Sequence, residues 1–145
     1  MNWLKRRTVL AVILFCLVTC SLPDIEIGLA SESEQIANPN FVLHVPNYYD
    51  DGNDHDYGIL VTTDEYYAED IWIVRCEHQT EKGLLDQFTY GILPEGCTTS
   101  VEPQALEIGK RYEIFVYIDC MDGYAHVFID ERGYLQIVEE GVTND

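Results

Sequence analysis

The chain has few basic residues for its length. Its 145 residues include 8 Lys and Arg against 26 Asp and Glu, which gives a formal charge of −18 at pH 7. Nucleic-acid binding requires clustered lysines and arginines that contact phosphates, so this composition argues against nucleic acid as a partner. The excess of carboxylates favours a basic protein as partner, because complementary charge speeds encounter. The alternative is that the charge serves solubility alone.

Sequence motifs of the common hydrolases and nucleotide-binding enzymes are also missing. The chain has no G-x-S-x-G, H-E-x-x-H, G-x-x-x-x-G-K or C-x-x-C motif. Ser100 has no His or Asp beside it in the sequence. A nucleophile formed by Cys120 and His126 is much less favoured than a buried structural thiol. We therefore predict a protein that is not an enzyme and that needs no cofactor and no metal.

The sequence lacks an apolar run long enough to span a membrane. The uncharged, mostly apolar segment from Thr8 to Cys20 is 13 residues long, whereas a membrane-spanning helix needs about 20 residues. It follows a basic head formed by Lys5, Arg6 and Arg7. A basic head followed by an apolar segment of roughly 7–15 residues is the layout of a secretory signal peptide. We therefore predict export to the bacterial periplasm.

A cysteine stands where the apolar segment ends. Residues 17–20 (LVTC) resemble the bacterial lipobox, a leucine three residues before a cysteine with small residues between them. The resemblance implies a signal peptide over 1–19, a lipid on Cys20 and, because Ser21 is not Asp, an outer-membrane location. Cleavage after Ala30 is the alternative and would leave a soluble periplasmic protein. Removing the leader takes away three basic and no acidic residues, which leaves five basic and 26 acidic residues and a charge of −21.

The remainder of the chain has the texture of a β protein. Residues 21–40 are polar and weakly patterned, which predicts a flexible tether. From Phe41 onward, short runs rich in β-branched and aromatic residues are bounded by Gly, Pro, Asn and Asp, which is the signature of strands. We expect seven strands, at 41–45, 57–63, 71–76, 87–93, 112–119, 124–130 and 134–138. This predicts one all-β domain over 41–145, a single antiparallel β-sandwich of the immunoglobulin or fibronectin type.

Turn residues refine this prediction. Residues 130–133 (DERG) predict a hairpin between the last two strands, with Gly133 available for a positive φ. Asp122 and Gly123 predict another turn, between residues 119 and 124. The strand at 112–119 is partly apolar on both of its faces, which indicates a central position in its sheet.

Three cysteines remain beyond the leader: Cys76, Cys97 and Cys120. Disulfides persist in the oxidising compartment of an exported protein, and an odd number predicts one pair and one free thiol. Cys76 ends an apolar strand and Cys97 lies in a turn-like segment that could reach it, which favours a Cys76–Cys97 disulfide. Cys120 would then be a small buried hydrophobe. A Cys76–Cys120 pair remains the alternative.

An acidic, tyrosine-rich stretch is the candidate for partner binding. Between residues 47 and 70 there are eight acidic residues, no Lys or Arg, and five tyrosines. Tyrosine is enriched at interfaces because it buries a large rigid face while its hydroxyl keeps a hydrogen bond. The residues expected at the contact are Tyr48, Tyr49, Asp50, Asp51, Asp54, Asp56, Tyr57, Tyr66 and Tyr67. The alternatives for the loop from Asp50 to Asp56 are a calcium site, although it lacks the EF-hand spacing, and a merely solvated loop.

Residues 88–117 carry a further resemblance. They contain aromatic-x-Tyr-Gly, then Pro-x-Gly, then Pro and Leu, then Gly-x-x-Tyr, formed by Tyr90, Gly91, Pro94, Gly96, Leu106, Gly109 and Tyr112. This resembles small proteobacterial envelope lipoproteins, some of them described as periplasmic immunity proteins of type VI secretion systems. The resemblance implies a β-sandwich that neutralises a basic toxin by occlusion, with a lysozyme-like envelope hydrolase as the second partner considered. The alternative is a structural or accessory envelope lipoprotein without a tight partner.

Overall fold

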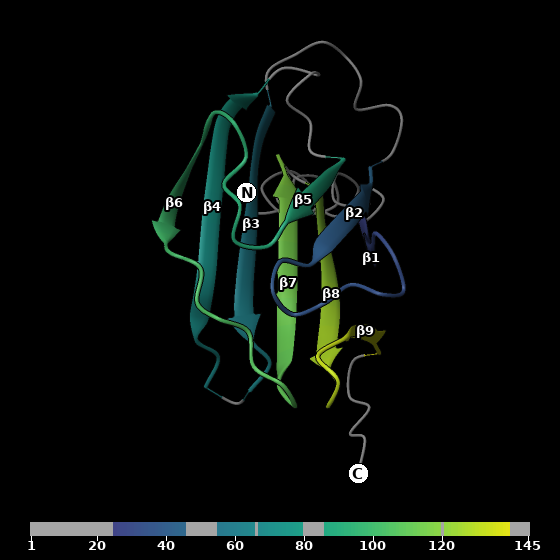
Figure 1. Ribbon diagram of the computed structural model, residues 1–145. Coiled ribbons are helices and arrows are strands. Elements are labelled where there is room, and N and C mark those ends of the chain that lie inside the picture. The colour runs from purple at the N-terminus through teal and green to yellow at the C-terminus, as the bar shows by residue number, and fades with distance from the viewer. Residues whose placement is uncertain (1–24, 46–54, 66, 80–85, 120, 140–145) are drawn as a thin grey trace, which may run out of the picture.

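The computed structural model describes residues 25–45, 55–65, 67–79, 86–119 and 121–139, and the regular structure in these ranges is entirely β-strand (Figure 1). One antiparallel sheet has the order β1-β2-β5. Its strands are β1 (Glu26–Leu29), β2 (Asn40–His44) and β5 (Gln87–Thr89). The other antiparallel sheet has the order β6-β4-β3-β7-β8-β9. Its strands are β3 (His55–Thr63), β4 (Asp70–Gln79), β6 (Cys97–Val101), β7 (Arg111–Ile118), β8 (Met121–Ile129) and β9 (Leu135–Val138).

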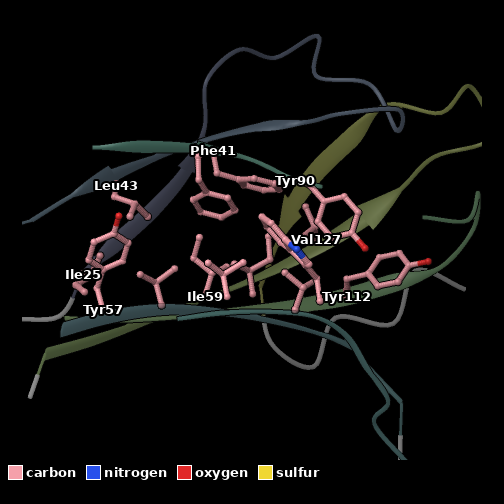
Figure 2. Close-up of a cluster of buried hydrophobic side chains, with 14 of the residues drawn as sticks. Ile25, Phe41, Leu43, Tyr57, Ile59, Tyr90, Tyr112 and Val127 are labelled. Atoms are coloured by element: carbon pink, nitrogen blue, oxygen red, sulfur yellow. The ribbon is translucent and has the colours of Figure 1, made fainter. Parts of the chain in front are cut away.

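The hydrophobic core lies between the two sheets (Figure 2). The small sheet contributes Phe41 and Phe88, whose rings stack with centroids 5.0 Å apart. Trp72 of β4 faces them from the large sheet, with its ring centroid 6.3 Å from that of Phe88 and 5.2 Å from that of Tyr90. Aromatic pairs at these separations add to the free energy gained from burial itself. The small sheet is thus fixed against one face of the large one.

Buried and partly exposed side chains alternate along β7, so one face of the large sheet packs on the core and the other does not. Ile114, Val116 and Ile118 are buried in the core, whereas Phe115 and Tyr117 between them are only partly covered. The strand pairs with β3 on one side and β8 on the other. The predicted central position of this strand is confirmed. Apolar residues on its outer face therefore belong to the sheet surface that the small sheet does not cover.

The predicted C-terminal hairpin is confirmed. β8 and β9 pair antiparallel, and Gly133 has a φ of 82° in the turn between them. The Asp130 carboxylate accepts hydrogen bonds from the backbone N–H groups of Tyr134 and Arg132, at 3.0 and 2.9 Å. These bonds, with that to Tyr134 foremost, hold the pKa of Asp130 below its usual value.

The turn before β8 lies earlier than predicted. Asp122 and Gly123 are residues of β8, and Asp119, with a φ of 50°, supplies the left-handed conformation that the turn requires. The small residue at position 123 serves packing instead, because the backbone of Ile25 lies against it.

The predicted flexible tether over 21–40 is wrong from residue 25 onward. Ile25 is 2% exposed, and its N–H donates to the Asp122 carbonyl over 2.8 Å. The next residues form β1, which pairs with β2 in register from Glu26 opposite His44 to Leu29 opposite Phe41. Four buried or half-buried apolar side chains in a polar segment suffice to bring it into the fold, since the segment also completes a sheet. The domain therefore begins before residue 41.

Candidate functional site

The predicted partner-binding surface lies only partly within the described residues. Those of its residues that fall outside them are Tyr48, Tyr49, Asp50, Asp51, Asp54 and Tyr66. The predicted lipidation site, Cys20, and the third mature cysteine, Cys120, also fall outside. Asp56, Tyr57 and Tyr67 are described, and the structure does not bring the three together on one surface.

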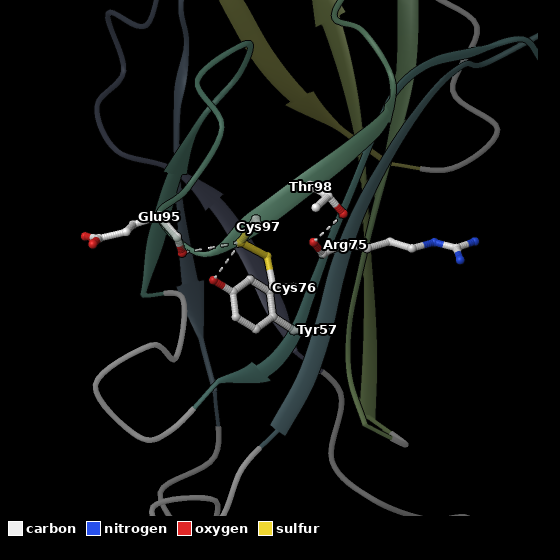
Figure 3. Close-up of a disulfide and its surroundings, with 6 residues drawn as sticks. All are labelled: Tyr57, Arg75, Cys76, Glu95, Cys97 and Thr98. Carbon is white, nitrogen blue, oxygen red and sulfur yellow. Dashed lines mark hydrogen bonds between the residues drawn. A yellow bond between two sulfur atoms is a disulfide. The ribbon is translucent and has the colours of Figure 1, made fainter.

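Tyr57 belongs to the core. Its side chain is 2% exposed, and its hydroxyl lies 3.6 Å from Sγ of Cys97 (Figure 3). Burial raises the pKa of this hydroxyl above its ordinary value. The prediction that Tyr57 contacts a partner is therefore wrong. The sequence did carry the signal, because Tyr57, Ile59 and Val61 alternate with period two and share the buried face of β3.

Asp56 and Tyr67 lie at opposite ends of β3. Asp56 is exposed at the start of the strand, and Tyr67, which is 82% exposed, follows the strand in the turn that leads to β4. A nine-residue strand spans roughly 27 Å at about 3.4 Å per residue. Closeness in sequence therefore does not give one continuous contact, and each end of the sheet has to be considered separately.

At the Asp56 end, a histidine–carboxylate pair fixes the backbone. His55 is 5% exposed, and its Nδ1 lies 2.6 Å from Oδ2 of Asp119. The other carboxylate oxygen of Asp119 accepts the N–H of Asp56 over 3.0 Å. The N–H of Asp119 in turn donates to the Asp56 carbonyl over 2.8 Å. These contacts attach the start of β3 to the turn between β7 and β8, beside the exposed Asp122.

At the Tyr67 end, two carboxylates already pair with basic side chains. Lys110 Nζ lies 3.0 Å from Oε1 of Glu65, and this hydrogen bond raises the pKa of the lysine. His126 Nδ1 lies 3.2 Å from Oδ2 of Asp64. The Lys110–Glu65 pair is exposed on both sides and contributes little to stability, whereas His126 and Asp64 are partly buried. Glu69 and Asp70 remain on the surface beside Tyr67, so this end also presents negative charge next to an aromatic ring.

The Cys76–Cys97 disulfide is confirmed, and it joins two strands (Figure 3). The two residues are direct partners in the ladder between β4 and β6, with their Cα atoms 4.3 Å apart. Cys97 begins β6, which is not among the seven expected strands. Thr99, on the same strand, donates its hydroxyl to the Ile73 carbonyl over 2.9 Å. The disulfide and this bond hold the edge strand β6 against the sheet.

A cavity of about 420 Å³ opens where the loop before β2 meets the segment after β6. Its lining contains no charged side chain: Ile36, Ala37, Asn38, Tyr90, Gly91, Pro103, Gln104, Ala105 and Leu106. Its polar groups bond one another, since the Tyr90 hydroxyl donates to the Gln104 carbonyl over 2.6 Å and Asn38 Nδ2 donates to the Tyr90 carbonyl over 3.2 Å. Tyr90, Gly91 and Leu106, from the segment singled out by resemblance, thus have structural roles here.

Within the described ranges, no three or more His, Cys, Asp or Glu side chains are grouped so that they could hold a metal ion. The same part of the chain contains no helix that is long and apolar enough to cross a membrane. In comparisons with protein-family models, curated proteins and solved structures, nothing matches this chain.

Proposed function

We propose that this chain is a periplasmic, membrane-anchored binding protein that neutralises a basic toxin or envelope hydrolase by occluding it. The observation that carries the proposal is the imbalance of charge on the surface. Arg75, Lys110, Arg111 and Arg132 are the lysines and arginines within the described ranges. Among them, Lys110 pairs with Glu65 and Arg132 with Asp130. Exposed aspartates and glutamates within the same ranges far outnumber these four cations. A basic partner would provide them.

The N-terminal strand supports anchoring at Cys20 over cleavage at Ala30. Cleavage after Ala30 would remove the buried Ile25 and the whole of β1, and so expose the edge of β2. Processing before Cys20 keeps every described residue. A lipid on Cys20 would hold the domain at the outer membrane, where a partner entering the periplasm arrives.

The architecture we propose is an immunoglobulin- or fibronectin-like β-sandwich with layers of three and six strands. The common core supports it, since Phe41 and Phe88 from the small sheet pack against Trp72 from the large one. Sandwiches present loops at both ends of their layers, which suits a protein that works by binding.

The test begins with the identity of the partner. The mature chain is used to capture proteins from the envelope and secretome of its own cells, and each captured protein is purified and assayed with and without the chain. We expect a basic protein whose lytic or toxic activity is lost in the complex. A captured protein that is acidic, or that stays fully active when saturated, contradicts the proposal.

Kinetics then test the acidic loop. Asp50, Asp51, Asp54 and Asp56 are changed together to Asn, and we expect the association rate at low salt to fall roughly tenfold and its salt dependence to flatten. The matched control changes four exposed glutamates elsewhere to Gln, namely Glu102, Glu107, Glu131 and Glu139. Equal effects of the two variants would show that overall charge, and not this loop, steers the partner.

A further inference from the structure

The outer face of the large sheet carries a row of apolar and aromatic residues. The register places Ile73, Leu60, Phe115 and Tyr124 directly opposite one another across β4, β3, β7 and β8, and Val101 extends the row onto β6. Opposite residues in antiparallel strands share a face. Five strands at about 4.8 Å spacing make this row roughly 19 Å wide. The buried neighbours Ile59 and Val61 point to the other face, into the core.

No described strand covers this row. β1, β2 and β5 pack on the opposite face of the large sheet, and the other strands belong to the sheet itself (Figure 1). Figure 3 shows the Arg75 side chain of β4 pointing away from Cys76 and Tyr57, which is the direction of this outer face. Tyr124 at the centre of β8 is 58% exposed. A tyrosine ring on the outer face of the sheet can therefore be reached from solvent.

The aromatic residues form one cluster. The ring centroid of Phe115 lies 4.7 Å from that of Tyr124 and 6.1 Å from that of Tyr117. Tyr117 lies over Gly58, since a Cβ added to that glycine would come within 2.5 Å of its Cε1 atom. The missing side chain at Gly58 thus lets the Tyr117 ring lie flat on the sheet, which supports its position beside Phe115.

Carboxylates flank this cluster in both strand directions. Asp122 is two residues from Tyr124 on β8 and lies opposite Tyr117. On the other side, Glu113 is two residues from Phe115 on β7 and lies opposite His126. Arg75, opposite Gly58, is the nearest arginine in the register, and it lies on the far side of β3 from this cluster. Aromatic faces between carboxylates match side chains that combine an apolar stem with a positive end.

We propose that the cluster of Phe115, Tyr117 and Tyr124 is the docking surface for arginine side chains of a basic partner. The guanidinium group stacks on the exposed ring of Tyr124, and its charge is met by Asp122 or Glu113. Arginine is favoured over lysine because its planar group stacks on rings and is less strongly hydrated. Leu60 and Ile73 extend the surface for apolar residues around the arginine. This inference rests on the proposed function and names the surface that performs it.

The test uses the mature chain with two probes of equal length, a decaarginine and a decalysine peptide. We expect the parent chain to bind decaarginine more tightly, and Tyr124→Ser to weaken that binding by about three- to tenfold and to remove most of the preference over lysine. Tyr124→Phe keeps the ring and should restore both. Ile108→Ser is the matched control, because Ile108 is as exposed as Tyr124, 56% against 58%, and lies outside this face. It should leave both affinities unchanged.

The Asp122→Asn variant tests the role of the carboxylate beside the cluster. Glu131→Gln, in the exposed hairpin turn, is its control. We expect only the first to weaken decaarginine binding. Because Tyr124 and Asp122 are exposed, each variant should fold. Thermal unfolding of Asp122→Asn should match that of the parent, and Tyr124→Ser should unfold only slightly earlier, because it loses the ring contact with Phe115. If Tyr124→Ser binds like the parent while the four-carboxylate loop variant binds weakly, this surface is wrong and the proposed function stands. If the parent binds neither peptide, this surface is wrong, whereas the proposed function is contradicted only by a captured partner that is acidic or that stays active.

Discussion

At Gly123 the first described residues of the chain cross β8. The N–H of Ile25 donates to the Asp122 carbonyl, and a Cβ on Gly123 would overlap the carbonyl oxygen of Ile25. The atom in the way belongs to the backbone, so it cannot turn aside as a flexible side chain would. Glycine is therefore required here for close approach of the segment before β1 to β8, and not for a turn.

Gly123→Ala should lower the free energy of unfolding by about 1–3 kcal/mol, which is the usual cost of forcing an extra methyl group into a packed site. Gly28→Ala is the control, since its Cβ would lie at an ordinary 3.4 Å from Cγ2 of Val42; its stability should stay within about 0.5 kcal/mol of the parent. Denaturant unfolding of the three chains measures both effects. Equal midpoints for Gly123→Ala and the parent would show that the N-terminal segment does not pack on β8.

Tyr90 makes stability depend on pH in the alkaline range. Burial, followed by the neighbouring Tyr112, raises the pKa of Tyr90 to about 12 from an ordinary 10.0. The folded state thus binds its proton more tightly than the unfolded state does. Below pH 10 both states are protonated and the full stability is present; from pH 10 to about 12 it is progressively lost as unfolding lets the hydroxyl ionise.

We expect thermal unfolding temperatures to fall across that alkaline range, and Tyr90→Phe to make the fall smaller. The variant loses the 2.6 Å bond to the Gln104 carbonyl, so its stability at neutral pH should be about 0.5–1.5 kcal/mol lower. Tyr67→Phe is the matched control, because Tyr67 is exposed. A parallel decline for parent and Tyr90→Phe would contradict the assignment.

At the scale of elements, the sequence predicted the strands that alternate strongly and missed the two that do not. All seven expected strands have a counterpart, although β5 ends at Thr89, well before the predicted residue 93. β1 (EIGL) is short and lies in a polar segment, and β6 (CTTSV) carries hydroxyl side chains that are equally common in loops. Both are edge strands, where one side of the ladder is empty and the residues need little hydrophobic pattern.

The candidate site was less predictable than the strands, because it depends on how the strands lie relative to one another. The Cys76–Cys97 pair was found because two cysteines near strand ends can meet. The acidic partner-binding surface expected from the sequence is not continuous, because β3 separates Asp56 from Tyr67 by its full length. The row through Leu60, Phe115 and Tyr124 depends on register between strands, which a single sequence does not contain.

Loss of β1 should weaken the whole domain. We compare a chain that begins at Ser21 with one that begins at Ser31. The shorter chain lacks Ile25 and the four-residue pairing with β2, so we expect its free energy of unfolding to be lower by at least about 3 kcal/mol, from lost burial alone. Ile25→Ala in the longer chain should reproduce about 2–5 kcal/mol of loss. Equal stability of the two chains would instead make cleavage after Ala30 structurally acceptable.

For the whole molecule, the early start of the fold changes how far an anchored domain can stand from the membrane. A tether of 20 residues would reach at most about 70 Å, whereas the four residues between Cys20 and Ile25 reach at most about 14 Å. A chain lipidated at Cys20 would therefore hold β1 and the neighbouring end of β8 close to the bilayer. The charge of −21 that would remain without the leader makes this arrangement less favourable, because anionic lipid repels an acidic surface.

Energy transfer measures this distance. The lipidated chain carries a fluorescent donor at the exposed position 31 and is reconstituted into neutral vesicles that contain acceptor lipids. We expect strong transfer, and a clear decrease when 20 Gly and Ser residues are inserted between positions 21 and 24, because a flexible linker of that length adds roughly 25 Å of mean end-to-end distance. Equal transfer for the two chains would show that the membrane does not constrain the domain through its N-terminus. Strong transfer in the parent places the fold within reach of partners at the bilayer surface, and the aromatic face of the large sheet stays available only if it points away from the lipid.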